Sequence, residues 1–149
     1  MKKVLLTVAL AQMTGAAAFA QRDSARVPPP RAIAMRCVRQ IHWMTDLTVA
    51  QMHSRGNRCV VVIGRLLEHD KGEEARQVAR RCGEEINALA ENRVRWISTR
   101  AEHCIMVLTH FEAPDRLKAL VREAAEHAIA AIRTHRARVQ EQIENALQP

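Results

Sequence analysis

Apolar residues recur every three or four positions along most of the chain, which is the spacing of one face of an α-helix. Polar and charged residues fill the positions between them. No stretch shows the strict apolar–polar alternation that is typical of a strand. The pattern therefore predicts three long helices, which span residues 32–68, 73–111 and 115–147.

Short polar segments separate the predicted helices. The first is the turn His69–Gly72, in which Gly72 can adopt a left-handed conformation. The second contains Pro114, which cannot continue a helix, and Asp115, which is favoured at a helix start. Segment 54–57 contains glycine and asparagine and leaves open whether the first helix is broken or kinked.

Two apolar runs, Val60–Ile63 and Cys104–Leu108, are too broad to be covered by one neighbouring helix. A third helix that folds back along the second covers both runs. The residues expected near the first run are Val139, Ile143 and Leu147, and those near the second are Leu117, Leu120 and Val121. The predicted fold class is all-α: a long antiparallel helical hairpin with a third long helix packed along it. The alternative is that part of one of the two runs stays exposed as a client or dimer surface.

The four cysteines lie symmetrically about the turn His69–Gly72. Cys37 and Cys59 are 22 residues apart in the first predicted helix, as are Cys82 and Cys104 in the second. Such a spacing puts two cysteines on one helix face, about 33 Å apart, which no disulfide can bridge. An antiparallel hairpin brings partners level only as Cys37–Cys104 and Cys59–Cys82. Two disulfides are therefore predicted, although a broken first helix would leave the outer one open.

The N-terminus has the three parts of a secretory signal peptide. Lys2 and Lys3 provide the positive charge, Val4–Ala11 is a short apolar segment, and Ala18 and Ala20 are the small residues of a cleavage site. Cleavage is predicted after Ala20. Export is also the setting in which an even number of cysteines forms disulfides. The predicted location is therefore the periplasm or the outside of the cell.

Removal of the signal peptide leaves a proline-rich leader at residues 21–31, which is predicted to be extended and disordered, and a helical bundle domain at 32–149. The formal net charge of the full chain is +7, and two lysines leave with the signal peptide. Nucleic acid is not the expected partner, because the protein is exported and no aromatic residues interleave with its arginines. The predicted helices are also not expected to span a membrane.

A protein partner or client, or an anionic envelope surface, suits this charge better, and a homodimer is a further alternative. The proposed partner surface consists of Val60, Val61, Ile63, Arg133, Arg136 and Arg138. Glutamates alternate with the arginines of the third predicted helix. This stretch therefore also fits an ordinary solvated helix face.

No combination of residues indicates catalysis. The serines have no recognisable neighbouring base, and no glycine-rich phosphate loop is present. The seven histidines form no H-x-x-x-H pair, so neither a metal site nor a cofactor is predicted. A redox-active cysteine pair usually has the close C-x-x-C spacing, which the chain lacks. The predicted function is non-catalytic binding, and the alternatives are a structural or oligomeric envelope component and a histidine-based metal-binding module.

The segment Leu47-Thr48-Val49-Ala50-Gln51 spells L-T-x-x-Q, and on this motif the chain resembles the Spy/CpxP group of periplasmic proteins. The resemblance implies a small, exported, all-helical chaperone or envelope-stress protein that forms a cradle-like dimer. The chain carries one copy of the motif, whereas that group commonly carries two, and the disulfide-spaced cysteines are not part of its pattern. Asp46 or Thr48 would serve as a helix N-cap if the first helix were broken here.

Overall fold

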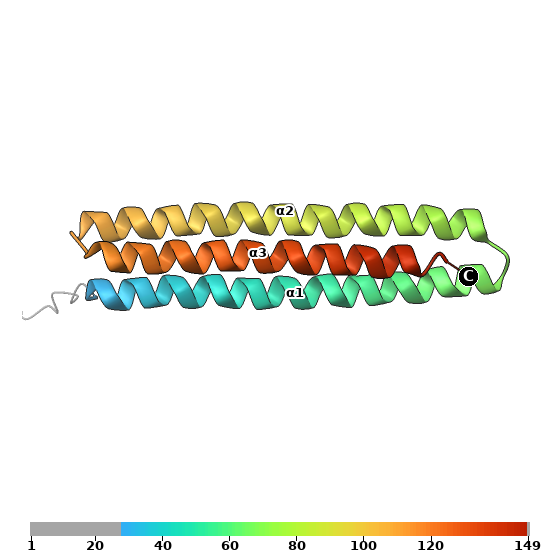
Figure 1. Ribbon diagram of the computed structural model, residues 1–149, viewed down its shortest axis with the longest axis horizontal. Coiled ribbons are helices and arrows are strands. Elements are labelled where there is room, and N and C mark those ends of the chain that lie inside the picture. Colours follow the sequence, from blue (N-terminus) through green and yellow to red (C-terminus); the bar gives the residue numbers. More distant parts are fainter. Residues whose placement is uncertain (1–27, 149) are drawn as a thin grey trace, which may run out of the picture.

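The computed structural model describes residues 28–148, which form three long helices and contain no strand. Helix α1 spans Pro30–Glu68, α2 spans Gly72–His110 and α3 spans Asp115–Asn145. Each helix contacts the other two, so the molecule is an elongated three-helix bundle (Figure 1). The predicted fold class is confirmed. The predicted signal peptide and most of the predicted leader lie outside the described residues.

The three helices alternate in direction. α2 runs antiparallel to α1, and α3 runs parallel to α1 (Figure 1). The first residue of α1 and the last residue of α3 therefore lie at opposite ends of the bundle. Among residues 28–148, no helix has both the length and the apolar character needed to cross a membrane.

Helix α1 begins two residues earlier than predicted and continues without interruption through residues 54–57. Pro30 occupies its first turn, where the missing backbone N–H costs no intrahelical hydrogen bond. Pro30 and Arg31, which the sequence placed in the leader, thus belong to α1. Residues 54–57, where a break or kink was an open alternative, are helical throughout.

Both connections between helices use a non-glycine residue in the left-handed region. Asp70 has φ 57° and Glu112 has φ 50°. In the first turn the Lys71 N–H donates to the Leu66 carbonyl at 2.9 Å, which closes the end of α1 as in a Schellman motif. The left-handed role expected for Gly72 was wrong. Asp70 takes it because that position allows the closing hydrogen bond to form, and Gly72 opens α2 instead.

The core is a single aliphatic cluster to which all three helices contribute. Its largest fully buried apolar side chains are Ile41, Met52, Ile63, Ile86, Ile97, Leu108, Val121, Ile132 and Val139. Small buried residues also line α3, namely Ala124, Ala125 and Ala128. Since α3 supplies part of this core, the α1–α2 hairpin does not bury its apolar surface alone.

Gly56 lies on the face of α1 that packs against α3. A Cβ atom built on Gly56 would lie 2.5 Å from Cγ1 of Val139, which is closer than non-bonded carbon atoms approach. The glycine therefore permits a close approach of the two helices and does not end α1. This contact also sets the level at which α3 meets α1, about one turn before the Val60–Ile63 run.

The two predicted disulfides are confirmed. Cys37 is bonded to Cys104 and Cys59 to Cys82, and the Cα–Cα distance is 6.3 Å in both pairs. All four cysteines are thus paired. Both bonds join α1 to α2, one near each end of the hairpin, and neither involves α3. Disulfides of this kind indicate an oxidising, exported environment.

Candidate functional site

The two disulfides have different surroundings. Cys37 and Cys104 are buried, with 5% and 1% of their surface exposed, whereas Cys59 and Cys82 are only half-buried. The inner pair lies in an open groove of about 400 Å³ between α1 and α2. The other residues that line this groove are Arg55, Arg58, Val62, Val78 and Glu85. The inner disulfide is therefore the one that a partner or a reductant can reach.

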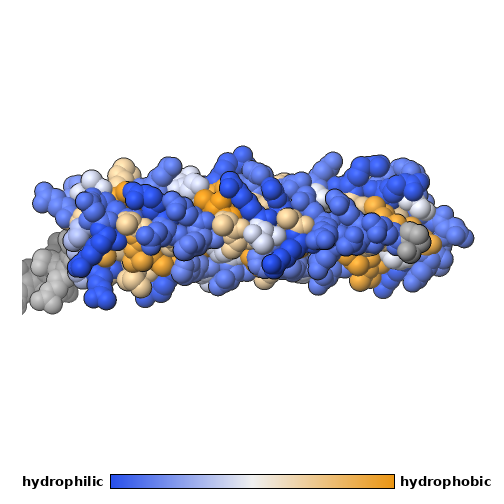
Figure 2. Space-filling view, in the orientation of Figure 1, coloured by the Kyte–Doolittle hydropathy of each residue, from blue (hydrophilic) through white to orange (hydrophobic). Residues whose placement is uncertain are grey.

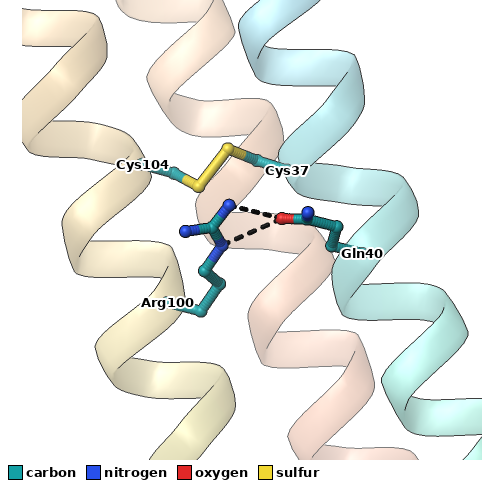
Figure 3. Close-up of a disulfide and its surroundings, with 4 residues drawn as sticks. All are labelled: Cys37, Gln40, Arg100 and Cys104. Atoms are coloured by element: carbon teal, nitrogen blue, oxygen red, sulfur yellow. Dashed lines mark hydrogen bonds between the residues drawn. A yellow bond between two sulfur atoms is a disulfide. The ribbon is translucent and has the colours of Figure 1, made fainter.

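Beside the outer disulfide, Arg100 of α2 extends across to Gln40 of α1 (Figure 3). Its Nε donates to Gln40 Oε1 at 3.0 Å, and a second guanidinium nitrogen donates to the same oxygen. Because the acceptor is a neutral amide, the charge of Arg100 is not neutralised by it. Arg36 and His103 line the adjacent pocket of about 190 Å³, so this end of the hairpin is locally basic.

Several large apolar side chains of the described residues are exposed. They are Met35, Trp43, Val61, Val62, Met106 and Phe111. Trp43 and Met106 are the most exposed, at 63% and 62%. Figure 2 shows one face of the bundle, where hydrophobic side chains form separate patches on a mostly hydrophilic surface. Scattered exposed apolar side chains are ordinary on a protein surface, so the feature to consider is the adjacent pair Val61 and Val62, of which Val62 lines the groove at the inner disulfide.

The structure corrects the predicted partner surface at one position. Ile63 is completely buried in the core, so it is not part of any surface. Val60 is half-buried and Val61 is 52% exposed. Val62, which the sequence analysis omitted, is 43% exposed. The helical phase explains the difference, because consecutive residues point about 100° apart and Ile63 points toward the other helices.

The arginines of that surface lie at a different level of the bundle. Arg133 and Arg138 are exposed, whereas Arg136 donates to Glu91 of α2 at 3.1 Å and is half-buried. Because Val139 meets Gly56, Arg133 precedes the level of Val61 by eleven residues, which is roughly 16 Å along the axis. The structure thus separates Arg133 from the exposed valines and engages Arg136 within the bundle.

The L-T-x-x-Q segment lies inside α1. Thr48 is completely buried, and its hydroxyl donates to the Met44 carbonyl at 2.7 Å. Leu47 and Gln51 are half-buried. The N-cap role considered for Asp46 or Thr48 was wrong, because α1 is continuous here and the Thr48 hydroxyl bonds backward, as it does in a helix interior.

A contact between two histidines joins α1 and α3. His53 Nε2 lies 3.0 Å from His135 Nδ1, and the rings meet edge to face. Burial holds the pKa of His135 below its usual value, and the nearby charges of His53 and Arg138 lower this pKa further. Sequence analysis missed the pair because the two residues are 82 positions apart. Only the register between α1 and α3 would have revealed it.

Two more polar contacts join α3 to the hairpin at the same level. They are the Arg136–Glu91 ion pair and a hydrogen bond of 3.0 Å from Gln140 Nε2 to Asn87 Oδ1. The other histidines of the chain, His42, His69, His103, His110 and His127, are exposed. Within residues 28–148, no three histidine, cysteine, aspartate or glutamate side chains are grouped as metal ligands.

No known protein family, curated protein or solved structure matches this chain. The described structure offers a covalently braced rod with exposed apolar side chains, arginines beside them, and one groove at a half-exposed disulfide. Such a surface can hold extended apolar and acidic segments of another polypeptide by burial and charge pairing.

Proposed function

We propose that this protein binds non-native polypeptide segments in the periplasm, as a non-catalytic, chaperone-like helical rod. The observation that carries the proposal is the exposure of Val61 and Val62 on α1, next to a groove that contains Arg55 and Arg58. A folded client hides its aliphatic side chains, whereas a non-native client exposes them, so apolar side chains on the rod select the non-native form.

Charge gives the proposed surface its preference among clients. The chain has 23 lysines and arginines against 16 aspartates and glutamates. Arg58 lies beside Val62 in the groove and forms no ion pair among the described residues, whereas Arg55 is 4.0 Å from Glu85. Clients that combine exposed aliphatic residues with acidic ones are therefore favoured, and rising salt weakens the charged part of binding.

The disulfides suit a role outside the cytoplasm. They hold α1 and α2 in register at two levels, so the exposed valines keep their position on a rigid support. A preorganised surface loses less conformational entropy when a client binds. The signal-like N-terminus and the resemblance of the L-T-x-x-Q segment to periplasmic chaperones support the same proposal.

The proposal is tested with the purified, oxidised protein and an acidic client that aggregates when heated. Light scattering by the client should fall in the presence of the protein. Replacement of both Val61 and Val62 by serine should remove most of this protection, because the apolar contact is lost. The matched control replaces the exposed Ala88 and Ala130 by serine. Equal protection by both double variants would contradict the proposal.

The same valines favour one competing function, a structural component that assembles with a second copy of itself. Sedimentation equilibrium separates the two possibilities. A dimer that forms with increasing concentration, and that Val61→Ser with Val62→Ser abolishes, would assign the valines to self-association. A protein that stays monomeric while it protects clients would assign them to client binding.

A further inference from the structure

Helix α3 is the only one of the three helices that no disulfide ties to its neighbours. The short connection from Phe111 to Pro114 joins it to α2 along the chain. Its remaining attachment is non-covalent packing against α1 and α2. The bundle therefore contains a pair of helices joined by disulfides and a third helix that can separate from them without the breaking of a covalent bond.

The polar side-chain contacts between α3 and the hairpin are concentrated in one short segment, residues 135–140. Within the described residues they are His135 with His53, Arg136 with Glu91, and Gln140 with Asn87. Val139, which packs against Gly56, belongs to the same segment. Disruption of residues 135–140 would therefore remove the polar contacts that attach α3 to the hairpin.

The histidine contact can exist in only two of its three protonation states. Two neutral rings form one N–H···N hydrogen bond, and a single added proton keeps a donor facing an acceptor. When both rings are protonated, His53 Nε2 and His135 Nδ1 both carry hydrogen at a distance of 3.0 Å, and two positive rings lie with their centroids 5.2 Å apart. The second proton therefore converts an attraction between α1 and α3 into a repulsion.

The surrounding charges do not compensate this repulsion. On α3, Arg138 adds positive charge near His135. On α2, Glu91 is engaged by Arg136, and Arg93, two residues further along, has a buried Nε without a hydrogen-bond partner. On α1 the group facing His135 is His53 itself. No carboxylate among the described residues bonds to either imidazole ring.

We propose that the His53–His135 contact is an acid-sensitive latch that releases α3 from the disulfide-clamped hairpin when both rings are protonated. The release uncovers core side chains of all three helices, among them Ile132 and Val139 of α3. α1 and α2 stay joined because disulfides do not respond to mild acid. The latch follows from the fold and does not depend on client binding.

Hydrogen exchange measured by mass spectrometry tests the latch. The oxidised protein is compared at about pH 7.5 and about pH 5.5, with EDTA present and with rates corrected for intrinsic exchange. At this lower pH histidines gain protons while most carboxylates remain charged. We expect amide protection in α3 to fall by at least about tenfold in acid, while protection in α1 and α2 falls much less.

Two variants identify the groups responsible. His135→Gln keeps an acceptor for His53 but cannot gain a proton, so its α3 protection should not change between the two pH values. His53→Gln should behave alike, which keeps the test valid if one variant folds poorly. His127→Gln, at an exposed position of the same helix, is the matched control and should retain the full response. An unchanged response in both latch variants, or equal loss of protection in all three helices, would overturn the proposal.

Discussion

Gly56 of α1 and Val139 of α3 lie so close that a Cβ atom on the glycine would be 2.5 Å from Val139 Cγ1. This contact joins residues 83 positions apart and fixes the register between two parallel helices. It also explains why a residue with poor helix propensity occupies the middle of a 39-residue helix. The position needs the absence of a side chain more than it needs helix propensity.

Substitution of Gly56 by alanine should therefore destabilise the protein. Overpacking against Val139 costs about 1–3 kcal/mol, which exceeds the gain of up to about 1 kcal/mol from helix propensity. Gly64→Ala in the same helix is the matched control, because nothing lies within 4 Å of its added Cβ, and it should be neutral or stabilising. Urea unfolding measures both variants. Equal stabilities would show that the close contact does not constrain the bundle.

Loss of either disulfide should lower the free energy of unfolding without removing the helices. The inner bond closes a loop of 23 residues and the outer one a loop of 67, for which chain entropy predicts losses of about 3 and about 4 kcal/mol. The variant without the inner disulfide, Cys59→Ala with Cys82→Ala, should therefore have a higher melting temperature than the variant without the outer one, Cys37→Ala with Cys104→Ala. Circular dichroism at room temperature should show that both variants stay helical. A non-reducing peptide map of the parent protein checks the pairing, and any other connectivity would contradict the fold.

Thr48→Val tests whether the L-T-x-x-Q segment has a packing role in α1. The Thr48 hydroxyl bonds only to the Met44 carbonyl of its own helix. Its removal leaves no buried group without a partner, because that carbonyl still accepts the backbone hydrogen bond of the helix. The variant should stay within about 1 kcal/mol of the parent protein, whereas Thr48→Ala should lose about 1–2 kcal/mol through the cavity that it leaves. Thermal melting distinguishes them. A large loss in Thr48→Val alone would assign the hydroxyl a role beyond packing.

Overall stability should increase with pH near neutrality. Burial lowers the pKa of His135 in the folded protein relative to an ordinary value of about 6.5, so the unfolded chain binds more protons in this range. The contribution of His135 is fully present above about pH 6.5 and is lost as the pH falls through the lowered folded-state pKa. The melting temperature of the parent protein should fall over this range, and His135→Gln should show a smaller fall. Parallel curves for the two proteins would exclude this histidine as the source.

The number of helices, their approximate ends and the disulfide pairing were predictable because each depends on distances measured along the chain. Helical periodicity sets the faces, and 22 residues of helix separate the cysteines too far for pairing within a helix. Hence Cys37–Cys104 and Cys59–Cys82 followed once the chain was folded at the turn between α1 and α2. Signal cleavage and residues 21–27 of the leader fall outside the described residues, so they stay predictions, whereas Pro30 and Arg31 of the predicted leader belong to α1.

The features that were missed depend on how α3 sits against the hairpin. Periodicity places α3 only to within about one turn, so the contacts of Gly56 with Val139 and of His53 with His135 were not accessible. The burial of Ile63 beside two exposed valines depends on the rotation of α1 about its axis, which periodicity does not give to within one residue. The left-handed conformation of Asp70 was missed because glycine is the usual residue in that conformation. The hydrogen bond from the Lys71 N–H to the Leu66 carbonyl determines which residue of the turn adopts it.

Because α1 and α3 run in the same direction, the chain enters the bundle at one end and leaves it at the other (Figure 1). Helix α1 alone is about 58 Å long. Because Val139 lies level with Gly56, anything attached before Pro30 is roughly 48 Å along the axis from anything attached after Asn145, as long as α3 stays packed on the crosslinked hairpin. The molecule has the geometry of a rigid spacer, with a separation between its attachment points that can be measured by energy transfer between dyes at the two ends.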